Sequence, residues 1–189
     1  MAAPNNLNPN PGDKRVLVVA GGDPWTGPLP RIGAAIAEVI AADSGVELAL
    51  QLGLPCSVVI GDLDSASPEA LAEAERLGAR IERHPADKEL TDLELALDLA
   101  CTNGAREIVV IGGGGGRNSH LLANAGLLAS EKYAHVLIRW LLPRTEVHIG
   151  RADQPVPVIG RPGELVSLIP IGGDATGVTT GGLKSVSYT

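Results

Sequence analysis

The first 140 residues or so alternate short runs rich in β-branched residues with amphipathic stretches, and this alternation constrains the fold more than any other feature. Strands that alternate with helices indicate a parallel sheet covered on both faces, so we predict an α/β domain. The predicted strands are residues 16–20, 39–42, 57–60, 80–83 and 107–111, and the predicted helices are 46–52, 68–77, 91–102 and 119–130. For residues 39–42 the alanine content leaves a helix running on from Ile32 as a competing interpretation.

After residue 133 the pattern changes to short apolar runs divided by Pro and Gly, with no helix between them, which is typical of an all-β region. These runs are residues 136–141, 145–149, 156–159 and 164–169. So short a sheet would not close by itself, so we expect a truncated C-terminus or strands completed by a partner subunit. The predicted organisation is a disordered arm over 1–14, an α/β domain over 15–134 and a small, incomplete all-β domain over 135–189.

Two carboxylates separated by one residue, Asp62 and Asp64, directly follow the predicted strand at 57–60. A magnesium ion takes oxygen ligands and binds through one or two carboxylates plus substrate phosphates, which such a pair can provide. A solvated turn is the alternative, because Asp and Ser favour turns for local hydrogen-bonding reasons. Asp43 and the glycine-rich loop 112–116 also follow predicted strands, and ligands of open α/β sheets bind beyond these strand ends. We therefore expect all of them to face one crevice.

A second acidic cluster, residues 87–92, precedes a predicted helix and could reach the same crevice. Thr91 and Glu94 have the spacing of a capping box, so the Thr91 hydroxyl is interpreted first as a helix cap. Asp92, at the first helical position, fits either stabilisation of the helix dipole or contact with a ligand.

The glycine loop 112–116 is followed by Arg117 and by a predicted helix. Backbone amides, a helix N-terminus and a guanidinium are groups that bind phosphate oxygens. The loop lacks the Lys-Ser/Thr ending of a P-loop and the spacing of a dinucleotide fingerprint. His84 and His120 lie near these motifs, and for each a polar structural role competes with a catalytic one.

The formal net charge of −7 argues against a nucleic-acid partner, whose phosphates require a basic surface. Cys56 and Cys101 lie far apart in apolar or helical sequence, which favours reduced thiols in a cytosolic protein over a disulfide. No apolar run approaches the roughly 20 residues that span a bilayer. We therefore expect a soluble, cytoplasmic protein with no membrane partner.

Read in order, these motifs resemble those of the thiamine pyrophosphokinase family. The family carries an Asp-Gly/Ser-Gly turn, Gly-Asp-x-Asp-Ser, Lys-Asp-x-Thr-Asp, Gly-Gly-Arg-x-Asp-His, Ser-Leu-x-Pro and Val-Thr-Thr-x-Gly-Leu. The counterparts here are residues 43–45, 61–65, 88–92, 115–120, 167–170 and 178–183. The resemblance runs from about residue 40 to the end of the chain.

The resemblance implies a Rossmann-like α/β domain followed by a β-sandwich, in a homodimer with its sites at the interface. It implies a Mg²⁺-dependent transfer of pyrophosphate from ATP to the thiamine hydroxyl, which gives thiamine diphosphate and AMP. The implied metal ligands are Asp62, Asp64 and Glu89. The implied catalytic residues are Asp43, Asp92 and Arg117, and the implied ATP-binding residues are Gly115, Gly116, Arg117, His120, Ser65 and Thr91.

Two positions depart from the family motifs. Glu89 stands where the family has Asp, and Ser119 stands where the family has the Asp before His120. The first substitution moves a charge outward by about one methylene and the second removes a charge. An alternative hypothesis is therefore a catalytically impaired homologue that binds a nucleotide or a thiamine phosphate.

Overall fold

The computed structural model describes residues 14–27, 32, 36–152, 155–158 and 160–183. Within this part of the chain, seven strands form one sheet with four α-helices and one 3-10 helix around it. The strands are β1 (Arg15–Ala20), β2 (Glu38–Ala42), β3 (Val58–Gly61), β4 (Arg80–Arg83), β5 (Glu107–Gly112), β6 (Leu137–Leu142) and β7 (Thr145–His148). The helices are α1 (Gly45–Gln51), α2 (Pro68–Arg76), α3 (Asp92–Thr102), α4 (Asn118–Leu128) and the 3-10 helix η1 (Glu131–Tyr133).

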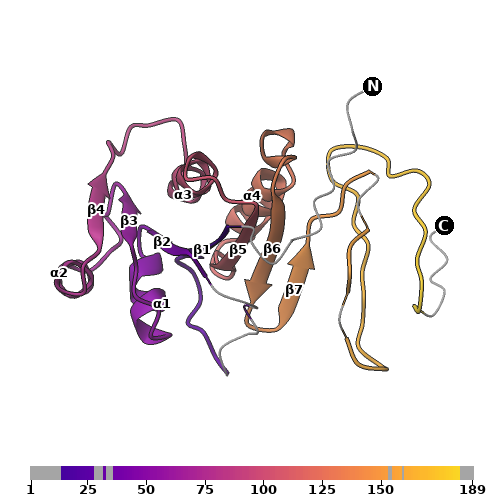
Figure 1. Cartoon of the computed structure of the whole chain (residues 1–189), viewed down its shortest axis with the longest axis horizontal. Helices are drawn as coiled ribbons and strands as arrows, with labels where there is room; N and C mark the ends of the chain where they lie inside the picture. The colour runs from indigo at the N-terminus through magenta and orange to yellow at the C-terminus, as the bar shows by residue number, and fades with distance from the viewer. Residues whose placement is uncertain (1–13, 28–31, 33–35, 153–154, 159, 184–189) are drawn as a thin grey trace.

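The sheet has the strand order β4-β3-β2-β1-β5-β6-β7, with β1 to β6 parallel and β7 antiparallel to β6 (Figure 1). The chain builds outward from β1 to β4 on one side and then crosses back to place β5 on the other side of β1. The predicted α/β domain with a parallel sheet is therefore confirmed. The run at 39–42 is the strand β2, as predicted, and not a continuing helix.

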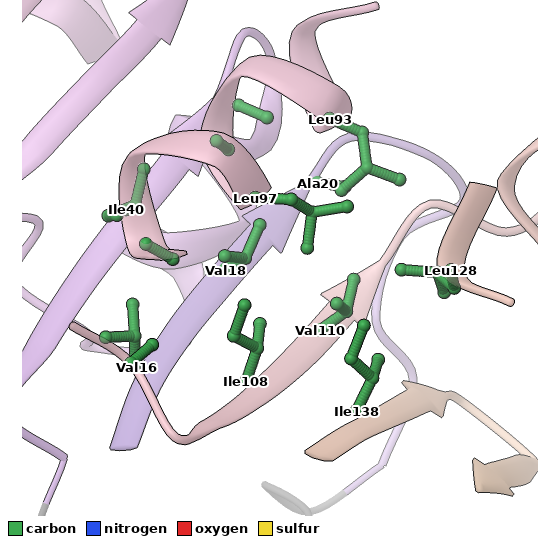
Figure 2. Packing of buried hydrophobic residues seen from close by; sticks show 14 of the residues in the cluster. Val16, Val18, Ala20, Ile40, Leu93, Leu97, Ile108, Val110, Leu128 and Ile138 are labelled. Atoms are coloured by element: carbon green, nitrogen blue, oxygen red, sulfur yellow. The ribbon is translucent and has the colours of Figure 1, made fainter. Parts of the chain in front are cut away.

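Alternate residues of the strands face two separate cores, as the two-residue period of a strand requires. One core combines strand residues such as Val16 and Val18 with Leu93 and Leu97 of α3 and with Leu128 of α4 (Figure 2). The other core lies on the opposite face of the sheet, where α1 and α2 pack. Both faces of the central strands are buried, which explains their continuous apolar sequences.

The predicted helix caps are present. The Ser67 hydroxyl accepts a hydrogen bond from the Ala70 N–H at 3.2 Å, and Pro68 follows at the first helical position of α2. The Thr91 hydroxyl accepts from the Glu94 N–H, also at 3.2 Å, at the start of α3. These bonds satisfy backbone donors that a helix leaves unpaired at its first turn, so each helix starts where its capping residue predicts.

The strands predicted at 136–141 and 145–149 form, but they join the α/β sheet instead of beginning a second one. Leu142 pairs with Thr145, so a two-residue turn connects β6 to an antiparallel edge strand. A hairpin at the edge of a parallel sheet and the start of an all-β domain have the same sequence pattern. The sequence pattern therefore predicts the two strands but not the sheet that they join.

The two later strands are absent from the described residues. The structure assigns no strand to residues 164–169 or to 156–158, and residue 159 lies outside the described residues. Leu165 is 98% exposed and Ile169 is 76% exposed, and this part of the chain runs on beyond β7 as extended segments (Figure 1). A strand needs a ladder of hydrogen bonds to a neighbouring strand, and no such ladder is assigned to these described residues. A C-terminal β-sandwich is therefore not part of the described fold.

The remaining predictions about the chain as a whole have mixed outcomes. The arm predicted over 1–14 lies outside the described residues except for Lys14, whose ammonium contacts Glu38 at 3.0 Å. Both cysteines are free thiols, as predicted. Across the residues that the structure describes, every helix is too short or too polar to cross a membrane.

Candidate functional site

The parallel strands β1, β2, β3 and β5 all end at the same edge of the sheet, and the loops that follow them define the candidate site. These loops begin at Gly21, Asp43, Asp62 and Gly113. The chain reverses its direction of growth between β1 and β5, which is the place where ligands bind in open α/β sheets. The crossing order therefore brings the predicted acidic and glycine-rich loops to one edge.

Asp43 lies between β2 and α1 in a left-handed conformation with φ of 45°. Its N–H donates to the Ile60 carbonyl at 2.9 Å, and its own carbonyl accepts from the Val46 N–H at 3.1 Å. These backbone bonds fix the carboxylate at the junction of β2, β3 and α1. The Oδ1 atom of Asp43 is buried without a hydrogen-bond partner, and burial is costly for such an oxygen unless a ligand satisfies it.

Asp62 and Asp64 project from a tight turn after β3. Leu63 between them is buried and has a φ of 63°, so its side chain fills the core while the two carboxylates point away from it. The Asp64 N–H donates to Asp62 Oδ1 at 3.3 Å, and the Ser65 hydroxyl donates to Asp64 Oδ1 at 3.0 Å. Ser65 therefore orients Asp64 in the described structure.

Carboxylate oxygens of Asp43, Asp62 and Asp64 lie within 4.8 Å of one another. This spacing suits one hard cation held by oxygen ligands. The unpartnered Asp43 oxygen supports the same fit, because a cation would satisfy it. Glu89, the third predicted metal ligand, does not belong to this group and is exposed; its place in the group is taken by Asp43, which lies closer to the turn because β2 and β3 are adjacent.

Lys88 lies between the two acidic segments. Its Nζ is 3.2 Å from Asp62 Oδ2 and 2.9 Å from Asp92 Oδ1. The same Asp92 oxygen accepts from the Asp62 N–H at 3.2 Å. Gly61 is needed beside it, because a Cβ there would lie 2.8 Å from that oxygen. Asp92 is thus held against the turn of Asp62, and the sequence had not assigned Lys88 any role.

The charges in this cluster shift its proton affinities in opposite directions. Burial raises the pKa of Asp43, and the nearby Asp92 and Asp62 carboxylates raise it further. The Asp64 N–H and then the Lys88 ammonium lower the pKa of Asp62. Partial burial would lower the pKa of Lys88, but its bonds to Asp92 and Asp62 outweigh that effect and raise the pKa.

The glycine loop after β5 is held by four hydrogen bonds to three segments: the loop after β1, strand β6 and helix α4. Gly113 N–H donates to the Gly21 carbonyl at 2.8 Å, and Asp23 N–H donates to the Gly114 carbonyl at 2.9 Å. The Trp140 indole N–H donates to the Gly112 carbonyl at 2.6 Å, and the Asn124 amide donates to the Gly113 carbonyl at 2.8 Å. These bonds fix the loop at the start of α4.

The predicted phosphate-binding groups follow this fixed part of the loop. Gly115, Gly116, Arg117 and His120 are all exposed, and Arg117 is the N-cap residue of α4 without a side-chain capping bond. Ser119 is exposed beside them. Their amides and side chains are therefore available to an anion at the N-terminus of an 11-residue helix.

Two other predicted residues have structural contacts. Thr91 caps α3, which is the first of the roles that the sequence allows. The backbone N–H of His84 donates to the Gly61 carbonyl at 2.8 Å, and the ring Nε2 of His84 lies 3.5 Å from Glu82 Oε1. Both help to position the turn after β3 and the start of α3.

Sequence reasoning missed the loop after β1 as part of the site. A Cβ on Gly22 would overlap the carbonyl of Gly114, and a Cβ on Gly115 would overlap the carboxylate of Asp23. The two loops therefore pack closely between β1 and β5, with the backbone of Gly22 against that of Gly114 and the Asp23 side chain against Gly115. The available signal was the Gly21-Gly22 pair, which directly follows the first predicted strand.

The fold and the site together define a doubly wound α/β protein with a carboxylate cluster and a glycine-rich loop at the carboxyl edge of its sheet. Residues 34–138, more than half of the chain, match the family model described as thiamin pyrophosphokinase, catalytic domain. The chain belongs to the thiamin pyrophosphokinase family, as the sequence motifs predict.

Individual relatives agree with this assignment. Thiamine pyrophosphokinase 1 of Oryza sativa subsp. japonica is 31% identical over 142 residues, which cover 67% of this chain and 51% of the rice protein. Thiamine pyrophosphokinase of Bacillus subtilis is 27% identical over 145 residues, which cover 77% of this chain and 68% of that protein. The chain thus matches about half the length of the rice relative.

Solved structures give the same result. A thiamin pyrophosphokinase family protein from Enterococcus faecalis superposes with a TM-score of 0.59 and 33% identity, covering 71% of this chain and 64% of that chain. Thiamine pyrophosphokinase from Bacillus subtilis gives a TM-score of 0.57 and 27% identity, covering 68% of this chain and 60% of that chain.

Proposed function

We propose that this chain catalyses the Mg²⁺-dependent transfer of pyrophosphate from ATP to the hydroxyl of thiamine. In this reaction the thiamine oxygen bonds to the β-phosphorus, the bond from that phosphorus to the α-phosphate oxygen breaks, and AMP and thiamine diphosphate form with loss of the hydroxyl proton. The observation that carries the proposal is the Asp43, Asp62 and Asp64 cluster, which lies inside the segment that matches the family's catalytic domain.

The residues have separate tasks in this proposal. Asp43, Asp62 and Asp64 hold the magnesium ion, which when bound neutralises phosphate charge during transfer. The Gly115 and Gly116 amides, Arg117 and His120 bind the triphosphate at the start of α4. Asp92 lies across the turn from this cluster and orients the thiamine hydroxyl, with Asp43 as the alternative. Ser65 and Thr91 act by positioning Asp64 and α3.

The β-sandwich and the homodimer that the family resemblance implies are also part of the proposal. Their support is the exposed apolar surface of the described chain, where Leu122 of α4 is 71% exposed and Leu165 is 98% exposed. Such side chains require a partner to leave water. Light scattering coupled to gel filtration tests this part, and a monomer at micromolar concentration contradicts it.

The test of the activity is AMP release from Mg-ATP with and without thiamine, together with direct detection of thiamine diphosphate. Thiamine-dependent AMP matched by product is expected. Asp64→Asn should abolish both signals, because it removes the most exposed of the three carboxylates without disturbing the core. ATP or thiamine binding by folded protein without any product would contradict the proposal.

A second candidate function, nucleotide or thiamine phosphate binding without turnover, is favoured by two observations. Glu89 is exposed outside the carboxylate cluster, and Ser119 supplies no charge beside Arg117. Ser119→Asp distinguishes the two candidates. In an otherwise competent site it should raise turnover severalfold, because it restores an acidic group next to the phosphate-binding loop. Unchanged turnover and unchanged ATP affinity would show that this position does not limit the reaction.

A further inference from the structure

Lys88 is shared between two parts of the acidic site. Of its two carboxylate partners, Asp62 belongs to the group of three carboxylates that could hold a metal ion, and Asp92 does not. The Lys88 ammonium contacts both, at 2.9 Å and 3.2 Å, and its side chain is only 14% exposed. An ion pair shielded to this degree is weakened less by water and salt than a pair at the surface.

The Lys88 ammonium contacts the carboxylates of Asp62 and Asp92, and Asp62 in turn lies in one group with the carboxylates of Asp43 and Asp64. The oxygens of three of these carboxylates, Asp43, Asp62 and Asp64, lie within 4.8 Å of one another, so the group holds more negative charge than one ammonium can neutralise. The lysine therefore neutralises part of a charge excess that a divalent cation would also neutralise.

Both cations would use the same carboxylate. Lys88 contacts Asp62 Oδ2, and Asp62 Oδ1 accepts the Asp64 N–H. A divalent ion bound by the Asp43, Asp62 and Asp64 oxygens would thus share Asp62 with the ammonium, and like charges a few ångströms apart repel strongly.

We propose that Lys88 is an internal counter-ion that holds Asp62 and Asp92 in place before metal binding and competes with the divalent cation for Asp62. It is a positioning residue that sets the metal affinity of the site, and it keeps the metal-free cluster folded at the cost of weaker cation binding. This inference rests on the metal site of the proposed function and adds to it the residue that tunes that site.

A competing counter-ion and a purely structural lysine have opposite effects on the metal affinity of the site. Removal of a purely structural lysine would loosen the cluster and weaken metal binding. Removal of a competing counter-ion strengthens metal binding, although it lowers the stability of the metal-free protein. The sign of the change in metal affinity therefore decides between the two roles.

The chain contains a matched control. Lys132 also bridges two carboxylates of α3, with Nζ 2.9 Å from Glu94 and 2.8 Å from Asp98. Neither partner belongs to the metal-competent group. Lys132→Met removes the same charge and the same type of double ion pair, but away from the site.

The test is calorimetric titration of the full chain with Mg²⁺ alone, at low ionic strength and without ATP or thiamine. Lys88→Met should bind Mg²⁺ about tenfold more tightly than the wild type. A change of that size is expected because it corresponds to the repulsion, in water, between a unit charge and a divalent charge a few ångströms apart. Lys132→Met should bind as the wild type does. In EDTA, both variants should melt at lower temperature than the wild type.

If Lys88→Met fails to fold, Lys88→Gln replaces it, since Gln keeps a hydrogen-bond donor without the charge, and the same tightening is expected. Unchanged or weaker Mg²⁺ binding by the variant would overturn the proposal, and so would no binding by either variant or wild type. Because no substrate is present, these outcomes are independent of whether the chain turns over thiamine.

Discussion

Gly112 is the last residue of β5, and replacing it with alanine should destabilise the sheet at the edge where the site is built. Gly112 has a φ of 82°, a conformation that costs an L-residue about 1–2 kcal/mol. A Cβ there would also overlap the carbonyl of Ala20 and lie 2.9 Å from a methyl group of Leu48. Strand β1 or the glycine loop would have to move to relieve that overlap.

The expected loss of unfolding free energy follows from these contacts. Overpacking a tight core site costs about 1–3 kcal/mol, and weakening the Trp140 bond to the Gly112 carbonyl costs about 1 kcal/mol more. With the backbone strain included, we expect Gly112→Ala to lose roughly 3–6 kcal/mol of unfolding free energy. That is a large share of the roughly 5–15 kcal/mol typical of a domain.

Gly104→Ala is the matched control, because Gly104 has the same φ of 82° with nothing within 4 Å of the added Cβ. It should lose only the backbone term of about 1–2 kcal/mol. Urea unfolding followed by the fluorescence of the buried Trp25 and Trp140 measures both variants. Equal losses for the two variants would refute the argument that close packing between β1 and β5 requires glycine at this position.

Two further predictions concern titratable groups. Because burial, and then Asp92 and Asp62, raise the pKa of Asp43 above its usual 3.8, ionising Asp43 costs stability as pH rises through that range. Asp43→Asn should therefore stabilise the metal-free protein at neutral pH, which urea unfolding measures, and weaken Mg²⁺ binding, which a Mg²⁺ titration measures. A variant less stable than the wild type would contradict this reasoning. Burial raises the pKa of Cys56 to about 11, so its thiol should resist a disulfide reagent at about pH 8 until urea unfolds the chain. Rapid labelling of Cys56 in the native protein would show that it is accessible.

Much of the site could be predicted from local sequence. Asp62, Asp64 and Asp43 were found because each follows an apolar run, and parallel strands place their carboxyl ends at one edge. Thr91 was correctly interpreted as a helix cap for the same local reason, since a hydroxyl three residues before Glu94 can accept its N–H.

Other parts of the site depend on contacts that sequence spacing does not reveal. Asp43 joins Asp62 in the carboxylate cluster because β2 and β3 are neighbours, whereas Glu89 is exposed and lies outside it. Lys88 reaches Asp62 across 26 residues of chain. Such a pairing requires the path of the backbone between the two residues.

The sequence by itself determined the elements of the α/β region and their caps, because periodicity and capping act over a few neighbouring residues. Only the tertiary structure decided that β6 and β7 complete the same sheet, that the Gly21-Gly22 loop packs on the glycine loop after β5, and that Lys88 lies between Asp62 and Asp92. The physical reason is that strand order and ion pairing depend on which distant segments become neighbours, and that is settled by burial of the whole sheet and not by local propensity.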